Sequence, residues 1–123
     1  MILVDTSIWV DHLRQGDERL TRLLGESQVL AHPYVIGELA LGTLQNRAVV
    51  LSALQDLPLA PVAADDEVLR FIQQNVLYGI GIGYIDAHLL AAVRLAPGTT
   101  LWTRDKRLLA AGATLGLAGN ARH

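Results

Sequence analysis

Four acidic residues stand in apolar surroundings, where an uncompensated carboxylate is costly. Asp5 comes directly after "MILV" and Asp105 shortly after "TTLWT", two runs that predict strands, while Glu38 and Asp86 lie in "VIGELALG" and "YIDAHLLAAV", which predict helices. In open α/β sheets, ligands bind beyond the carboxyl ends of the strands. Because four carboxylates that converge there would repel one another, we expect a cation to neutralise them.

Clustered carboxylate oxygens are the hard ligands that Mg²⁺ and Mn²⁺ prefer. Such an ion polarises phosphoryl oxygens and activates water, so the substrate expected for this site is a phosphodiester. In this hypothesis Asp5, Glu38 and Asp86 hold a first ion, and Asp105 holds it through water or helps with a second. Because water and not a ribose hydroxyl is the nucleophile, the expected products carry a 5′-phosphate and a 3′-hydroxyl.

Each acid also has a purely structural interpretation. Asp5 and Asp105 could cap the helices that follow them, although Thr6 or Ser7 and Thr103 could do that work instead. Asp86 could be an acid in the first helical turn after a glycine-rich stretch, and Glu38 could simply point to solvent. A shared site is favoured because the structural interpretation requires four independent coincidences.

The composition limits which functions are plausible. The 123 residues suit a single domain covering 1–123, and the absence of cysteine excludes disulfides and thiolate chemistry. With a net charge of −2, any nucleic-acid binding must depend on local cations. Candidate contacts to nucleic-acid phosphates, with ordinary surface charge as the alternative, are Arg14, Arg104, Lys106 and Arg107. No apolar run is long enough to span a bilayer and no secretion signal precedes Asp5, so we expect a cytoplasmic protein.

Strands and helices are expected to alternate, which is typical of an α/β fold with a mostly parallel sheet. Ser7 and Asp65 are the expected N-caps of the first helix and of the helix over 66–79. Strands are expected around residues 2–4, 29–31, 59–63 and 99–103, with a last candidate at 114–119; helices are expected over 8–14, 17–26, 33–43, 46–57, 66–79, 84–96 and 104–113.

Four segments resemble the motifs of PIN-domain ribonucleases, in particular toxins of the VapC type. They are "LVDTSIWVDHLR", "GELALG", "YIDAHLLAA" and "LWTRDKRL", and with them the resemblance covers essentially the whole chain. It implies a three-layer fold in which helices flank a short central sheet. It also implies Mg²⁺- or Mn²⁺-dependent endoribonuclease activity, a homodimer, and inhibition by a cognate VapB-type antitoxin.

The resemblance also implies roles for individual residues. Asp5, Glu38, Asp86 and Asp105 fall on the family's acidic metal-binding quartet. Two supporting hydroxyls are implied as well: Thr6 or Ser7 after the first acid, and Thr103 before the fourth.

Two other functions remain open at this point. A receiver-like phosphotransfer domain also uses an aspartate at a strand end with Mg²⁺, but it would need adjacent acids after the first strand, and "VDTS" has one. A non-catalytic protein with the same fold is the other alternative. Among the remaining residues, Trp102 is expected in the core, Trp9 half exposed, and His88 at the periphery.

Overall fold

The computed structural model describes residues 1–119 and contains a three-stranded parallel sheet at its centre. The strands are β1 (Ile2–Val4), β2 (Val29–Leu30) and β3 (Thr100–Trp102), in the order β2-β1-β3. Ile2 is in register with Val29 on one side and with Thr100 on the other. Since the strands are parallel, their carboxyl ends share one edge, and Asp5 lies at that edge directly after β1.

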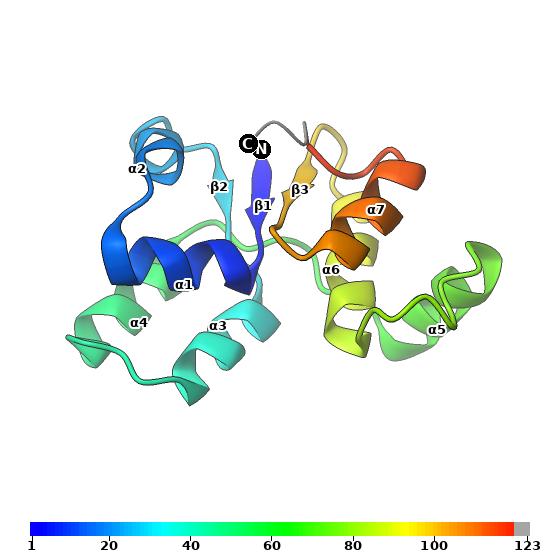
Figure 1. Cartoon of the computed structure of the whole chain (residues 1–123), viewed down its shortest axis with the longest axis horizontal. Coiled ribbons are helices and arrows are strands. Elements are labelled where there is room, and N and C mark those ends of the chain that lie inside the picture. The colour runs from blue at the N-terminus through cyan, green and yellow to red at the C-terminus, as the bar shows by residue number, and fades with distance from the viewer. Residues whose placement is uncertain (120–123) are drawn as a thin grey trace.

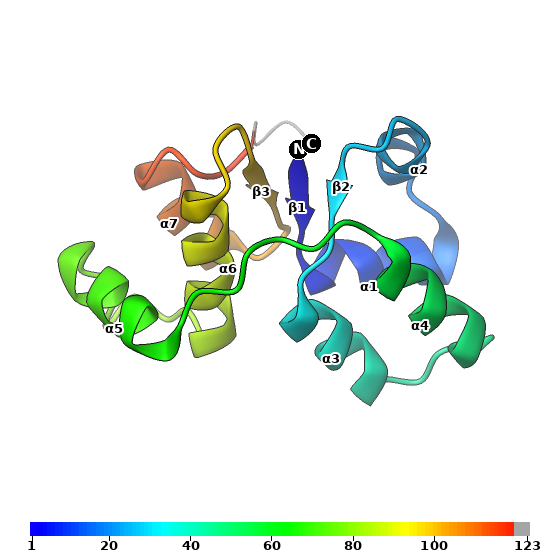
Figure 2. The ribbon, with the colours of Figure 1, turned by 180° about the vertical axis from the view of Figure 1, so that it is seen from behind.

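Helices cover the sheet from two sides, as Figures 1 and 2 show, with α1 to α4 on one side of the strands and α5 to α7 on the other. This arrangement agrees with the expected three layers. The helices are α1 (Thr6–Gln15), α2 (Glu18–Gly25), α3 (Pro33–Leu41), α4 (Arg47–Asp56), α5 (Asp65–Gln74), α6 (Tyr84–Leu95) and α7 (Lys106–Thr114). No helix among the described residues is long and apolar enough to cross a bilayer.

The hydrophobic core forms around the short strands and α6. Leu3, Val4 and Leu101 are fully buried, as expected for strands covered on both faces. Every residue from 87 to 93 of α6 is buried, including His88. The expectation that His88 lies at the periphery is therefore wrong: the helix is buried all round, so no polar face exists to carry the histidine.

Two expected strands are reduced to single bridges. Leu59 pairs with Ala31, and Ala118 pairs with Leu101, without further ladder bonds. After the bonds from Ala31 N–H to Pro58 and from Ala60 N–H to Ala31, the first ladder would next need the N–H of residue 33, and Pro33 has none. The chain instead crosses behind the sheet as a strap between α4 and α5, which is visible in Figure 2.

The capping residues also differ from expectation. Asp5, not Ser7, caps α1, and Ala64, not Asp65, precedes the first residue of α5. Trp9 is 4% exposed, so it belongs to the core and not to a half-exposed surface. Trp102, at 5%, is in the core as expected.

Candidate metal centre

Asp5 is buried at the carboxyl end of β1 and held by three hydrogen bonds. Its Oδ1 accepts the Thr6 backbone N–H at 2.7 Å. Its Oδ2 accepts the Ser7 hydroxyl at 3.1 Å and the Thr103 hydroxyl at 2.7 Å. The bond from Thr6 caps α1, while the two hydroxyls fix the carboxylate plane. The capping and the functional interpretations of Asp5 are thus compatible.

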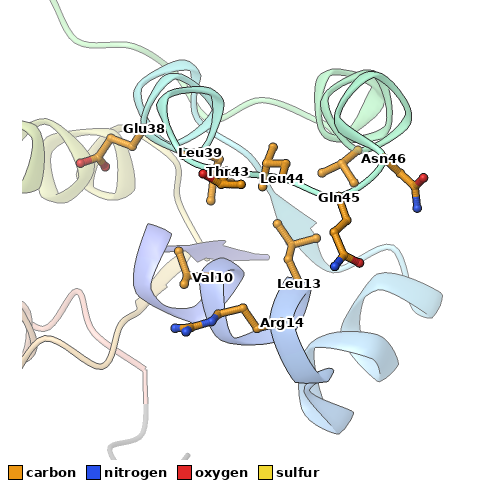
Figure 3. A pocket seen from close by; sticks show the side chains of 11 residues that line it. Val10, Leu13, Arg14, Glu38, Leu39, Thr43, Leu44, Gln45 and Asn46 are labelled. Atoms are coloured by element: carbon orange, nitrogen blue, oxygen red, sulfur yellow. The ribbon is translucent and has the colours of Figure 1, made fainter.

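Glu38 reaches the same end of α1 from the neighbouring helix α3. Its Oε1 accepts the Thr6 hydroxyl at 2.7 Å. The side chain is exposed, and Figure 3 shows it extending away from Leu39 and the rest of the groove lining. The apolar surroundings expected for Glu38 are therefore wrong, because the neighbouring Leu41 is itself 91% exposed. Thr6 thus connects the two acids, because its hydroxyl donates to Glu38 and its backbone N–H donates to Asp5.

Asp86 lies in the first turn of α6, where its Oδ2 accepts the Gly83 N–H at 3.0 Å. Burial raises the pKa of Asp86, and the Gly83 hydrogen bond opposes that effect. The negative charges of Asp5, Asp105 and Glu38 raise this pKa further, in that order. All four acids therefore share one electrostatic environment, although they come from four separate segments of the chain.

Asp105 is exposed and caps α7. Its Oδ1 accepts the N–H groups of Arg107 at 2.9 Å and Leu108 at 3.0 Å. Its own N–H donates to the Thr103 hydroxyl at 3.0 Å, and that hydroxyl donates to Asp5. Thr103 thus supports Asp105 and Asp5 together and is not the competing cap.

No lysine, arginine or histidine among residues 1–119 forms an ion pair with any of these four carboxylates. Nor do any three histidines, aspartates or glutamates in that range form a group that could hold a metal ion as they stand. The backbone compensates the negative charges of the four acids in part. Three of the four carboxylates accept N–H groups at helix N-termini, where the helix dipole is positive. The donors are oxygens only, on one buried, one half-buried and two exposed carboxylates, and their chemistry fits a hard divalent cation.

The candidate phosphate contacts have different surroundings. Arg14 lines a groove of about 760 Å³ that also includes Glu38, with Leu13 and Leu44 in its wall (Figure 3). Lys106 is exposed at the start of α7, and the Arg107 guanidinium lies against the backbone of Gly81. Arg104 instead pairs with two carboxylates, Asp11 and Asp17, so its charge is already compensated.

The sequence analysis missed a buried cluster of histidine and tyrosine rings between α3 and α6. The ring of Tyr34 packs edge-on against His32 and His88, with centroid distances of 5.1 and 4.7 Å. His32 Nδ1 accepts the Tyr34 N–H at 3.0 Å and so caps α3. His88 Nε2 lies 3.3 Å from Asp65 Oδ1 at the start of α5. The cluster joins the two helices that carry Glu38 and Asp86, and no spacing motif in the sequence indicates it.

Comparison with known proteins connects this chain to a family. The family model for the PIN domain matches residues 2–113. The chain is also 53% identical, over 118 residues, to "Ribonuclease VapC32" of two Mycobacterium tuberculosis strains, CDC 1551 / Oshkosh and ATCC 25618 / H37Rv. Each match covers 96% of this chain and 95% of the relative. No solved structure matches at a significant level. The family match and the parallel sheet confirm the expected α/β fold, and the chain belongs to the PIN-domain family, among its VapC-type ribonucleases.

Proposed function

We propose that this chain is a metal-dependent endoribonuclease, the toxin of a toxin–antitoxin pair, with Asp5, Glu38, Asp86 and Asp105 as its metal ligands. The observation that carries the proposal is the environment of Asp86, whose pKa is raised by burial and then by the other three carboxylates. Charges that repel in this way, with no cationic side chain paired to them in the described residues, are stabilised by binding a divalent ion. The named relatives support RNA as the substrate.

The protein's own side chains orient the proposed ligands. Asp5, Glu38 and Asp86 would hold a Mg²⁺ or Mn²⁺ ion, and Asp105 would hold it through water or share a second one. Such an ion, when bound, polarises the phosphoryl oxygen and lowers the pKa of water. Thr6 holds Glu38, while Ser7 and Thr103 hold Asp5, so these two carboxylates are oriented before an ion binds.

Cationic side chains are expected to hold the RNA backbone at this site. Arg14, Lys106 and Arg107 are the candidates for holding its phosphates, since Arg104 is paired with aspartates. Attack by water displaces the ribose 3′ oxygen and leaves a 5′-phosphate and a 3′-hydroxyl. These end groups distinguish this reaction from cleavage by the ribose 2′-hydroxyl, which leaves a 3′ or cyclic phosphate.

Metal removal is the direct test of the function. With Mn²⁺ or Mg²⁺ the purified chain is expected to cut RNA internally, and EDTA is expected to abolish cutting. Binding to the folded state alone should also raise the free energy of unfolding, by about 2.7 kcal/mol at a Mn²⁺ concentration 100 times its Kd. RNA cleavage that persists in EDTA would contradict the proposal. Labelling of an aspartate by acetyl phosphate, without RNA cleavage, would support a phosphotransfer domain instead.

Substitutions at Asp105 separate its role as the cap of α7 from its proposed role as a metal ligand. Asp105→Ser keeps an acceptor for the N-terminus of α7 and is expected to preserve stability, whereas Asp105→Ala should destabilise the fold by about 1 kcal/mol. Both variants lack the carboxylate and are expected to cut RNA at least about 10-fold more slowly. Denaturant unfolding and initial cleavage rates measure the two effects separately. A serine variant with the activity of the unmodified chain would show that Asp105 serves only as a cap.

We further propose that the chain forms a homodimer, acts in the cytoplasm where its RNA substrate is found, and is inhibited by a VapB-type antitoxin. Membership of the VapC-type ribonucleases supports these partners. The groove beside Glu38 and the exposed side chain of Leu41, which lies one turn after Glu38 on α3, are surfaces that a second chain could cover.

A further inference from the structure

We propose that Arg104 is a positioning residue of this centre: it fastens the loop that carries Thr103 and Asp105 onto α1. The inference depends on the proposed metal centre, since its effect is expressed through Asp5 and Asp105. Sequence position alone suggested that Arg104 contacts RNA phosphates. Its surroundings in the folded chain assign it a different partner.

The guanidinium of Arg104 is shared between two carboxylates that belong to consecutive helices. One of its terminal nitrogens pairs with Asp11 in the middle of α1, and the other donates to Asp17 Oδ2 at 2.7 Å. Asp17 is itself fixed, because its Oδ1 accepts the Leu20 N–H at 2.9 Å and so caps α2. The Asp17 end of the ion pair therefore starts from an ordered group, which reduces the entropy cost that weakens most surface pairs.

The pKa of Asp17 is consistent with this pairing. Partial burial raises it, but the hydrogen bonds from the Leu20 N–H and from Arg104, with the charge of Arg104, outweigh that effect. The pKa of Asp17 consequently lies below its ordinary value. The arginine stabilises a charged carboxylate that burial alone would disfavour.

The backbone of the same residue leads directly to the proposed ligands. The Arg104 N–H donates to the Ser7 hydroxyl at 3.2 Å, and that hydroxyl donates to Asp5 Oδ2 at 3.1 Å. On either side of Arg104, the Thr103 hydroxyl donates to Asp5 and accepts from the Asp105 N–H. Residues 103 to 105 are thus attached to the start of α1 through the backbone, and to its middle through the guanidinium.

Two attachments to one helix fix the direction of the loop, whereas one would leave it free to rotate. Without the guanidinium, Asp11 and Asp17 repel each other, and the bonds to Asp5 and Ser7 are the side-chain bonds that still join residues 103–105 to the start of α1. We therefore expect the separation between the Asp5 and Asp105 carboxylates to become variable. Groups that orient metal ligands in this way contribute about 10- to 100-fold to metal affinity or activity.

A binding measurement on Arg104→Gln tests the role without relying on activity alone. The Kd for Mn²⁺, measured calorimetrically on the metal-free chain, is expected to rise about 10-fold. The kcat for RNA cleavage at limiting Mn²⁺ should fall by a similar factor and recover in part at saturating Mn²⁺. The KM for RNA should stay within about twofold, because Arg104 does not contact the phosphates in this proposal.

Three outcomes would overturn the assignment. A phosphate contact would raise the KM and lower the salt dependence of RNA binding by about one counterion, with the Kd for Mn²⁺ unchanged. A merely structural pair would lower only the unfolding midpoint, leaving Kd and kcat intact. If the unmodified chain binds no Mn²⁺, this role falls together with the metal centre. If it binds Mn²⁺ but cuts no RNA, only the proposed function fails, and the Kd comparison still decides the role of Arg104.

Two further variants provide a control and a second test of the same ion pair. Arg70→Gln removes an arginine from an exposed pair with Asp66 on α5 and is expected to change neither Kd nor kcat. Asp11→Asn removes one partner and leaves Asp17 in place, so it should weaken Mn²⁺ binding in the same direction, by less than the loss of Arg104. If Arg104→Gln does not fold, the Asp11 variant decides the question, and an unchanged Kd would refute the proposal.

Discussion

Asp5→Asn is expected to lower the rate of metal-dependent RNA cleavage by about 1,000-fold. An ion that stabilises the transition state of phosphoryl transfer contributes several kcal/mol, and a factor of 1,000 corresponds to about 4 kcal/mol. Asp5 is the most buried of the four acids and the one held by the most side chains. Replacing its charge by an amide removes the ligand whose geometry is most firmly fixed.

The fold is expected to survive this substitution. The asparagine Oδ1 can still accept the Thr6 N–H, and asparagine is among the best N-caps. The Ser7 hydroxyl can rotate to accept from the new amide. Since Asp5 is among the charges that raise the pKa of Asp86, that pKa should move down toward its ordinary value in the variant. Carbon-detected NMR titration of the metal-free protein would measure this change.

The effect of Asp5→Asn must be compared with that of the same aspartate-to-asparagine change elsewhere in the chain. Asp56→Asn alters an exposed aspartate at the end of α4, remote from the four acids in sequence and without a role in the proposed centre. Its cleavage rate should match that of the unmodified chain. Undiminished metal-dependent cleavage by the folded Asp5 variant would refute the assignment of the centre.

Acid is expected to destabilise the fold through His32. This residue is completely buried, and burial, with a smaller effect of the neighbouring His88, lowers the pKa of His32 from 6.5 to about 4. Between these two pH values, His32 is protonated in the unfolded chain and remains neutral in the folded chain. Stability contributed by neutral His32 is therefore complete above about pH 6.5, decreases as the pH falls toward 4, and does not decrease further below it.

The expected size of this effect is about 3 kcal/mol from the difference between the two pKa values, and about 2 kcal/mol after screening by nearby solvent. Urea unfolding at a series of pH values measures it. Asn at position 32 can still cap α3 but does not titrate, so the His32→Asn variant should lose about 2 kcal/mol less between pH 7 and pH 4. Equal losses in the two proteins would show that other groups cause the acid sensitivity.

The strands and acids could be predicted because their signals are local. "MILV" and "TTLWT" are apolar runs of strand length, and an acid behind such a run in an α/β chain falls at the sheet edge where ligands bind. The structure agrees, since β1 and β3 lie side by side and bring Asp5 close to Thr103. Local sequence could not decide whether capping and function compete; the structure shows that Asp5 caps α1, and in the proposed centre the same carboxylate also binds the metal.

The unpredicted features depend on contacts between distant segments. Arg104 looked like a free cation because its partners, Asp11 and Asp17, lie about ninety residues earlier in the chain. His88 looked peripheral because it stands two residues after Asp86 and so on a different face of the helix. In the structure Tyr34 and Tyr84 pack against its ring, and the side chain is fully buried. Strand pairing at 59–63 and 114–119 failed because apolar composition does not supply the backbone geometry for a ladder.

In the proposed centre, Asp5 and Asp105 each cap a helix and bind the metal through the same carboxylate, and this has a genetic consequence. Cells that must escape a toxic nuclease select inactive alleles, and an aspartate codon becomes an asparagine codon by a single G-to-A transition. At Asp5 and Asp105 that change keeps the acceptor that starts α1 or α7. Escape alleles that arise by this change are therefore expected to encode folded, abundant proteins. Such proteins would continue to occupy an antitoxin, and so would raise the toxicity of any active copy in the same cell.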